Sequence, residues 1–130
     1  MLMEISFPGG AAVDARFKGH TVRTDQPEKA GGHDTGPAPF DLFLASIGTC
    51  TGYYAARYCE LKGIDPRRLS LRLETVRDEE RKRLAKVRVE IKLPPDFPDK
   101  YRQAIVRAAD QCTVKRHIVE PPELEVVAVR

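Results

Sequence analysis

Apolar and polar residues alternate in the first part of the chain, as in strands that bury only one face. The alternation covers residues 3–7, resumes over 11–17 after the turn signal at 8–10, and returns at 21–24 after Gly19. We therefore expect three short strands in an antiparallel meander.

Residues 39–62 have apolar positions every three or four residues, which predicts one long helix. A proline opens it, where the missing N–H needs no partner, and Gly63 follows as a stop signal. Gly48 and Gly52 interrupt its middle, where Gly costs about 1 kcal/mol relative to Ala. Two glycines flanking Cys50 indicate that another backbone or a ligand comes close there.

The remaining pattern predicts a hairpin, a helix and a final strand. Alternation over 69–75 and 85–93 indicates two strands joined by a charged, solvated turn. A second helical stripe begins near residue 98, and the alternation returns at 124–129. The expected order is three strands, helix, two strands, helix and strand, which is the α+β class.

The composition is that of one soluble domain spanning residues 1–130. The chain is 42% hydrophobic and 32% charged. Its net charge of +3 is too small and too scattered to favour a nucleic-acid partner. No stretch approaches the about 18 apolar residues of a membrane span, and no signal-peptide pattern opens the chain. We expect a cytoplasmic protein with no membrane partner.

Cys50 and Cys112 have the most distinctive surroundings in the sequence. Each lies in a segment with helical character, among small and hydroxyl side chains, and a cationic run (115–117) follows Cys112. Such surroundings can stabilise a thiolate, although free cysteines are often simply small buried residues. The three cysteines have neither zinc-ribbon spacing nor a second ligand motif, so we expect no metal and no cofactor.

The third cysteine, Cys59, cannot pair with Cys50 inside one helix. It follows half a rotation away and about 13 Å further along the axis, whereas a disulfide needs Cα atoms within about 7 Å. A spare thiol on the other helix face is the expectation for Cys59.

Two motifs together resemble a known family. The stretch GHDTGPAPFDLFLASIGTC (residues 32–50) is similar to the start of the central helix in the OsmC/Ohr superfamily, the osmotically inducible and organic hydroperoxide resistance proteins. AADQCTVK (residues 108–115) resembles its second cysteine motif. The resemblance extends along nearly the whole chain and is closest to the YhfA-like branch.

The resemblance implies an OsmC-like fold and an intertwined homodimer, with two central helices between sheets and active sites at the subunit interface. It also implies a thiol-dependent peroxidase that reduces a hydroperoxide or another small-molecule substrate. Cys50 would attack the O–O bond, Cys112 would resolve the sulfenic acid as a disulfide, and a dithiol reductant would reopen it.

The expected activating network is only partly matched. In the peroxidase branches an arginine from the N-terminal strands and a glutamate at the start of the central helix favour the thiolate. Arg16 or Arg23 would be this arginine. The alternative for each is a solvent-exposed strand residue without a role in the site. Phe40 occupies the glutamate position, while Asp41 comes one residue later, where it favours a capping role.

These departures leave other functions open. Phe40 makes the pocket more apolar, which would suit a non-catalytic small-molecule-binding protein on the same scaffold. Thr113 stands where many superfamily members have a proline. Thiol–disulfide exchange with a partner protein is a third option.

Overall fold

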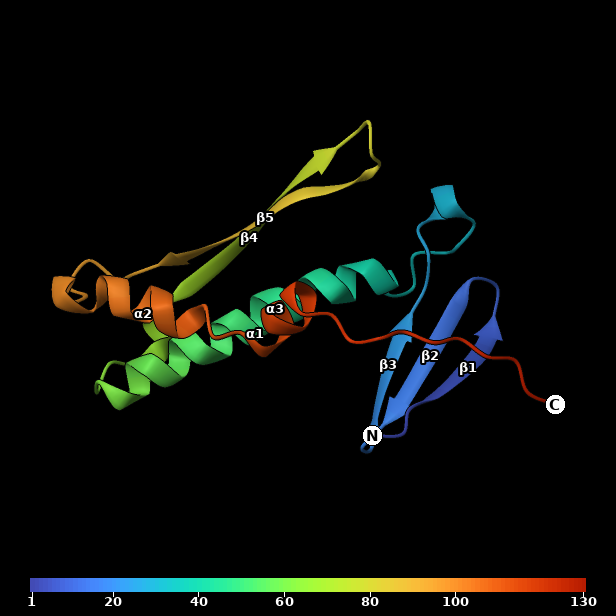
Figure 1. Cartoon of the computed structure of the whole chain (residues 1–130), viewed down its shortest axis with the longest axis horizontal. Coiled ribbons are helices and arrows are strands. Elements are labelled where there is room, and N and C mark those ends of the chain that lie inside the picture. The colour runs from blue at the N-terminus through green and yellow to red at the C-terminus, as the bar shows by residue number, and fades with distance from the viewer. The chain divides into compact units, whose positions relative to one another are not determined.

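The computed structural model describes all residues from Met1 to Arg130 (Figure 1). It contains helices and two separate antiparallel sheets, which confirms the α+β class. The chain divides into two compact units, Met1–Ala45 and Ser46–Arg130. None of the helices combines the length and the apolar character needed to cross a membrane.

The N-terminal unit begins with the expected meander. Strands β1 (Glu4–Gly9), β2 (Ala12–Phe17) and β3 (His20–Thr24) pair antiparallel in the order β1-β2-β3. The turn between β2 and β3 needs left-handed backbone, with φ of 49° at Lys18 and 78° at Gly19. Glycine reaches this region without strain, which explains the turn signal in the sequence.

A folded loop, residues 25–37, follows β3, and it is organised around one carboxylate. Asp25 is only 2% exposed and accepts hydrogen bonds from the backbone N–H groups of Gln26, His33 and Thr35 and from the Thr35 hydroxyl. The hydroxyl of Thr35, followed by the backbone N–H groups, lowers the pKa of Asp25 to about 2. The glycine-rich segment is therefore a fixed turn built on a buried anion.

Helix α1 runs from Pro39 to Leu61, close to the predicted boundaries. The Asp41 carboxylate accepts a hydrogen bond from the Ala38 N–H at 3.0 Å, which is half of a capping box. At the other end Gly63 adopts φ of 68°, and its N–H bonds to the Glu60 carbonyl. The chain can leave the helix there because glycine tolerates the left-handed conformation.

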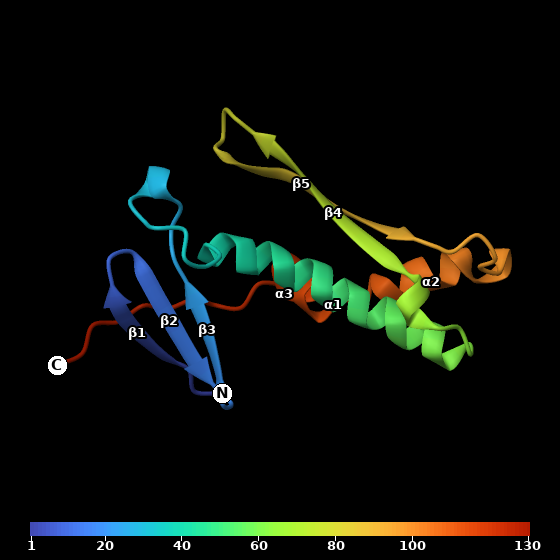
Figure 2. The ribbon, with the colours of Figure 1, turned by 180° about the vertical axis from the view of Figure 1, so that it is seen from behind.

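The second sheet, in the C-terminal unit, is the predicted hairpin of β4 (Ser70–Asp78) and β5 (Arg83–Lys92), which run together in Figure 2. Leu73 and Leu71 of β4 face Gly48 and Gly52 of α1, respectively. A Cβ built on either glycine would lie 3.7 Å from the facing leucine, which is ordinary van der Waals contact.

The close backbone expected at these glycines is not found within the chain, whereas the expectation of a ligand stays a prediction. Apart from the leucine side chains, no atom of another segment comes within 4 Å of the Cβ position at Gly48 or Gly52. Neither glycine is therefore required by close backbone approach inside one chain.

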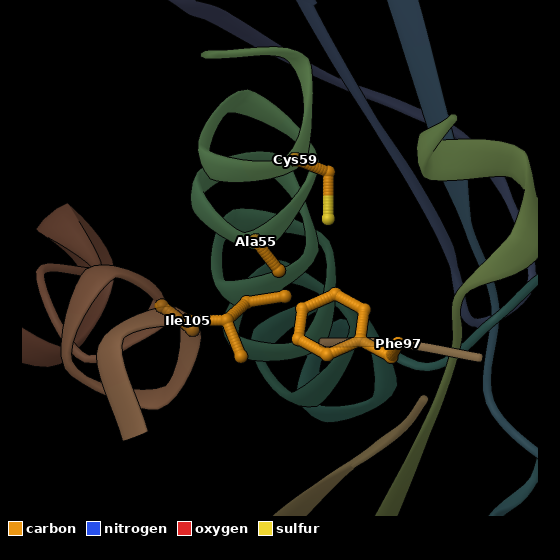
Figure 3. Packing of buried hydrophobic residues seen from close by; sticks show 5 residues of the cluster. Ala55, Cys59, Phe97 and Ile105 are labelled. Atoms are coloured by element: carbon orange, nitrogen blue, oxygen red, sulfur yellow. The ribbon is translucent and has the colours of Figure 1, made fainter. Parts of the chain in front are cut away.

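The core of the C-terminal unit joins α1 to α2 (Arg102–Ala109). It consists of buried residues from the second half of α1, the turn before α2, and α2 itself. Figure 3 shows Ile105 pointing from α2 toward the Phe97 ring, next to Ala55 of α1. The buried set is Ala55, Cys59, Phe97, Ile105 and Ala109.

The second helical segment is broken, contrary to the sequence-based expectation of one helix around Cys112. Helix α2 ends at Ala109, and a separate helix, α3, covers Thr113–Val119. Cys112 lies at the break with φ of −50° and ψ of 117°, as the N-cap of α3. Periodicity did not reveal this break because the stripe of apolar residues continues across it.

The predicted C-terminal strand is also absent. Residues 121–130 form no strand, and Leu124, Val126 and Val129 are 88%, 97% and 88% exposed. A strand is stabilised by a hydrogen-bonded neighbour and by covering one face, and this segment has neither. Alternation alone indicates a suitable strand, not the presence of its partner.

Candidate functional site

The two cysteines singled out in the sequence come together. Cys50 and Cys112 approach within 3.3 Å, and both belong to the C-terminal unit. Both are free thiols. An S–S bond is about 2 Å long, so closing this pair to a disulfide requires only a small movement.

The pair combines one accessible and one enclosed thiol. Cys50 lies in the middle of α1 and is half-buried, whereas Cys112 at the start of α3 is 2% exposed. A small oxidant therefore meets the Cys50 sulfur more readily. Cys112 lies behind it in the protein interior.

One hydrogen bond joins α1 to α3 at this point. The Tyr54 hydroxyl, one turn after Cys50, lies 2.9 Å from the Thr113 hydroxyl, directly after Cys112. The Thr51 hydroxyl donates to the Ile47 carbonyl within α1 at 2.7 Å. Sequence reasoning missed Tyr54 and Thr113 as site residues. The only available signal was their position beside the two cysteines.

The surroundings of Cys112 favour its thiolate. Its sulfur accepts a hydrogen bond from the backbone N–H of Lys115 at 3.4 Å, as an N-cap side chain does. Burial raises the pKa of the Cys112 thiol, but hydrogen bonds outweigh burial and the net pKa lies below the ordinary value. The donors are the Lys115 N–H, the Cys50 thiol and the Val114 N–H.

The cationic side chains after Cys112 have other partners. The Lys115 ammonium forms an ion pair with Asp110. The His117 ring nitrogen Nδ1 lies 2.8 Å from the Thr113 carbonyl oxygen. The Cys112 sulfur is contacted by backbone N–H groups and by the Cys50 thiol, so the cationic run favours the thiolate through its backbone.

Cys59 lies in the core. It is fully buried beside Ala55 and Ile105, and burial raises the pKa of its thiol. A buried thiol with a raised pKa is unreactive at neutral pH. The sequence placed Cys59 on the helix face opposite Cys50, and the structure adds that α2 covers this face.

The candidate arginines belong to the other unit, on neighbouring strands. Arg16 pairs with Thr21 across β2 and β3, and Asp14 pairs with Arg23. Because side chains alternate along a strand, Asp14, Arg16 and Arg23 project from the same face of the sheet. All these positions lie within the N-terminal unit, and both arginines are exposed.

The start of α1 presents an apolar surface in place of the expected acid. The rings of Phe40 and Phe43 stack at a centroid distance of 5.5 Å, and both are exposed, at 54% and 39%. The neighbouring carboxylate of Asp41 is occupied by the Ala38 N–H. Its geometry is that of a helix cap.

Comparison with known proteins decides the family. The family model described as OsmC-like protein matches residues 32–127, which include both cysteines of the pair. The chain belongs to the OsmC-like protein family. The match includes α1, the β4–β5 hairpin and both short helices. A search of curated proteins finds no match.

Solved structures show the same fold for this OsmC-like protein. A Psychrobacter arcticus protein assigned to osmotic stress and detoxification response has a TM-score of 0.75 at 19% identity, covering 88% of this chain and 85% of its own. The organic hydroperoxide resistance protein OhrB of Bacillus subtilis gives 0.51 at 20%, covering 90% of each chain. A Legionella pneumophila organic hydroperoxide resistance protein OsmC gives 0.58 at 16%, covering 90% and 87%.

Proposed function

We propose that this OsmC-like protein reduces hydroperoxides with the Cys50/Cys112 dithiol, with Cys50 as the peroxidatic and Cys112 as the resolving cysteine. The observation that carries the proposal is the 3.3 Å approach of the two thiols from different helices. A pair so close can alternate between dithiol and disulfide without rearrangement of the core.

The proposed reaction divides into two bond exchanges. The Cys50 thiolate attacks the terminal peroxide oxygen, the O–O bond breaks, and the alkoxide leaves and takes up a proton as an alcohol. Cys112 then attacks the sulfur of the Cys50 sulfenic acid, forms the S–S bond and releases water. A dithiol reductant supplies the two electrons that reopen the disulfide.

Accessibility and family support this assignment of roles. Cys50 is the less buried thiol of the pair, as an attacking sulfur should be, and Cys112 is enclosed behind it. Two of the similar structures are named organic hydroperoxide resistance proteins. Both cysteines are free thiols and not part of a structural disulfide, so they can react with an oxidant.

The wider assembly is part of the proposal. We infer one functional domain over residues 1–130 that acts as an intertwined homodimer in the reducing cytoplasm, where the dithiol can be regenerated. The many exposed apolar side chains support association with a second copy, among them Phe7, Leu61, Val119 and Val126 at 79%, 74%, 69% and 97% exposure. Arg16 or Arg23 is the proposed cation of the assembled site, and Asp41 supports it by capping α1.

The experiment that tests the function is a titration of reduced protein with cumene hydroperoxide and with H2O2. We expect one equivalent of oxidant to be consumed per protomer, together with a Cys50–Cys112 disulfide found by peptide mass mapping. Cys50→Ser should abolish consumption, whereas Cys59→Ala should leave it unchanged. Full turnover by Cys50→Ser would refute the proposal.

A second function is favoured by the exposed Phe40–Phe43 pair. A non-catalytic protein that binds a small apolar or aromatic molecule would use this surface while its thiols stay reduced. One similar structure, from Vibrio cholerae, holds a molecule of captopril in an active site. If this alternative is right, peroxide leaves the thiols reduced, and an aromatic ligand raises the melting temperature in the natural protein but not in Phe40→Ala.

A further inference from the structure

We propose that Cys112 also acts before resolution, as the proton acceptor that activates Cys50. This inference rests on the proposed peroxidase function and assigns a step within it. A protonated thiol is a poor nucleophile, so the attacking sulfur needs a neighbouring base at neutral pH. The structure supplies one candidate at contact distance, which is the Cys112 sulfur.

The other polar and titratable groups around the pair are engaged elsewhere. The Lys115 ammonium is paired with Asp110, and the His117 ring contacts the Thr113 carbonyl. The Tyr54 hydroxyl is bonded to the Thr113 hydroxyl. None of these three contacts involves the Cys50 sulfur.

Cys112 is built to carry negative charge. The Lys115 backbone N–H points at its sulfur at 3.4 Å, and the Cys50 thiol adds a further hydrogen bond. The direction of its pKa shift, below the ordinary value, agrees with this geometry. When the pair loses one proton, these contacts favour the charge on Cys112 and leave the proton on Cys50.

Burial prevents Cys112 from being the attacking sulfur itself. At 2% exposure its sulfur offers an oxidant almost no approach, whereas Cys50 is half-buried. The charge is thus stored on the enclosed sulfur and the reaction occurs at the accessible one. The two cysteines approach within 3.3 Å, so one proton passed between them links the stored charge to the reaction.

The steps balance with a single shuttled proton. The Cys50 proton moves to Cys112, and the Cys50 thiolate takes the terminal oxygen of the hydroperoxide. The leaving alkoxide receives the proton from Cys112 and departs as an alcohol. The regenerated Cys112 thiolate then attacks the Cys50 sulfenic acid, forming the disulfide and expelling hydroxide, which solvent protonates.

The decisive experiment measures the first step alone. A cysteine that only resolves is not needed for the first equivalent of peroxide, so its removal should not slow that step. We expect Cys112→Ser to slow consumption of the first equivalent of cumene hydroperoxide about 100-fold, the low end of the usual effect of general acid–base catalysis. Serine retains a good N-cap acceptor for α3, and the melting temperature checks the fold. Cys59→Ala is the matched control.

A second measurement does not depend on peroxide. Ultraviolet titration of thiolate should show the first thiol ionising at a lower pH in the natural protein and in Cys50→Ser than in Cys112→Ser, because those two proteins keep the Lys115 N–H bonded to the Cys112 sulfur. His117→Gln removes a titratable ring that contacts the Thr113 carbonyl, and it must leave the thiolate titration unchanged.

The outcomes separate the two proposals. If the natural protein forms no Cys50–Cys112 disulfide with peroxide, the proposed function fails. If it forms the disulfide but Cys112→Ser consumes the first equivalent at the natural rate, only the proton-acceptor role fails. A thiolate that titrates at the same pH in Cys112→Ser as in the natural protein would also overturn the role, because Cys50 would then ionise without Cys112.

Discussion

The hydroxyl of Tyr54 lies 2.9 Å from the hydroxyl of Thr113, and this hydrogen bond joins α1 to the start of α3 beside the two thiols. Each partner is close in sequence to one cysteine, so the bond acts directly on their separation. A proline at position 113 could not make it, because proline has no hydroxyl. Thr113 thus takes part in the arrangement of the pair.

Tyr54→Phe should weaken formation of the disulfide. A hydrogen bond of this kind contributes about 1 kcal/mol net, so its loss should reduce the equilibrium constant for the Cys50–Cys112 disulfide about fivefold. The measurement is equilibration in a redox buffer with thiol trapping and mass analysis. Tyr53→Phe is the control, since Tyr53 is 60% exposed and the hydrogen bond with Thr113 is made by Tyr54. Equal effects of the two substitutions would count against the proposed positioning role.

Cys59 should behave as a core residue and not as a redox thiol. In native protein a thiol-alkylating reagent should modify Cys50 while Cys59 stays unmodified until unfolding, because burial both shields Cys59 and raises the pKa of its thiol. Cys59→Ser should lower the free energy of unfolding by about 1–3 kcal/mol, because it places a hydroxyl in the apolar core without a compensating hydrogen bond. Denaturant unfolding and timed alkylation with mass mapping check both points. Early modification of Cys59 would contradict them.

Asp25 should make the loop stable only while its carboxylate is ionised. Its folded-state pKa of about 2 lies below the ordinary 3.8, so the stabilisation is complete above pH 3.8 and is lost as the pH falls toward 2. Asp25→Asn should speed amide exchange at His33 and Thr35 at pH 7. The difference from the natural protein should shrink as the pH is lowered through this window. A difference that is independent of pH would show that the charge is not responsible.

Gly32 and Gly52 should respond oppositely to alanine. A Cβ on Gly32 would lie 1.9 Å from the Gln26 carbonyl oxygen, so the backbone must shift. The expected loss of stability for Gly32→Ala is about 1–3 kcal/mol. Gly52→Ala meets only ordinary contact with Leu71 and should gain up to about 1 kcal/mol from helix propensity. Thermal unfolding measures both, and destabilisation by Gly52→Ala would mean that a second chain fills this space.

Local pattern was a good guide where the stabilising contacts are themselves local. The meander of β1 to β3, helix α1 and the β4–β5 hairpin follow the periodicity of the sequence. Gly63 ends α1 in the left-handed conformation that glycine commonly adopts after a helix. Strand pairing through tight turns and i to i+4 helical contacts depend on residues a few positions apart. The sequence therefore contains all that these elements require.

The errors fall where distant contacts decide. The strand expected at 124–129 has the right alternation but no hydrogen-bonded neighbour in the chain. The break at Cys112 cannot be seen in a continuous apolar stripe. Asp25 was overlooked because a carboxylate in a polar loop does not reveal its hydrogen-bond donors. These donors are Gln26, His33 and Thr35, all later in the same loop.

The sequence by itself determined the type and order of most elements, the resemblance to one family, and the two cysteines that merit attention. Only the tertiary structure decided that those thiols lie 3.3 Å apart, that Cys112 is the enclosed one, and that Cys59 belongs to the core. The physical reason is that periodicity records which face of an element is buried. The distance between two elements, and the groups that meet there, depend on how the whole unit packs.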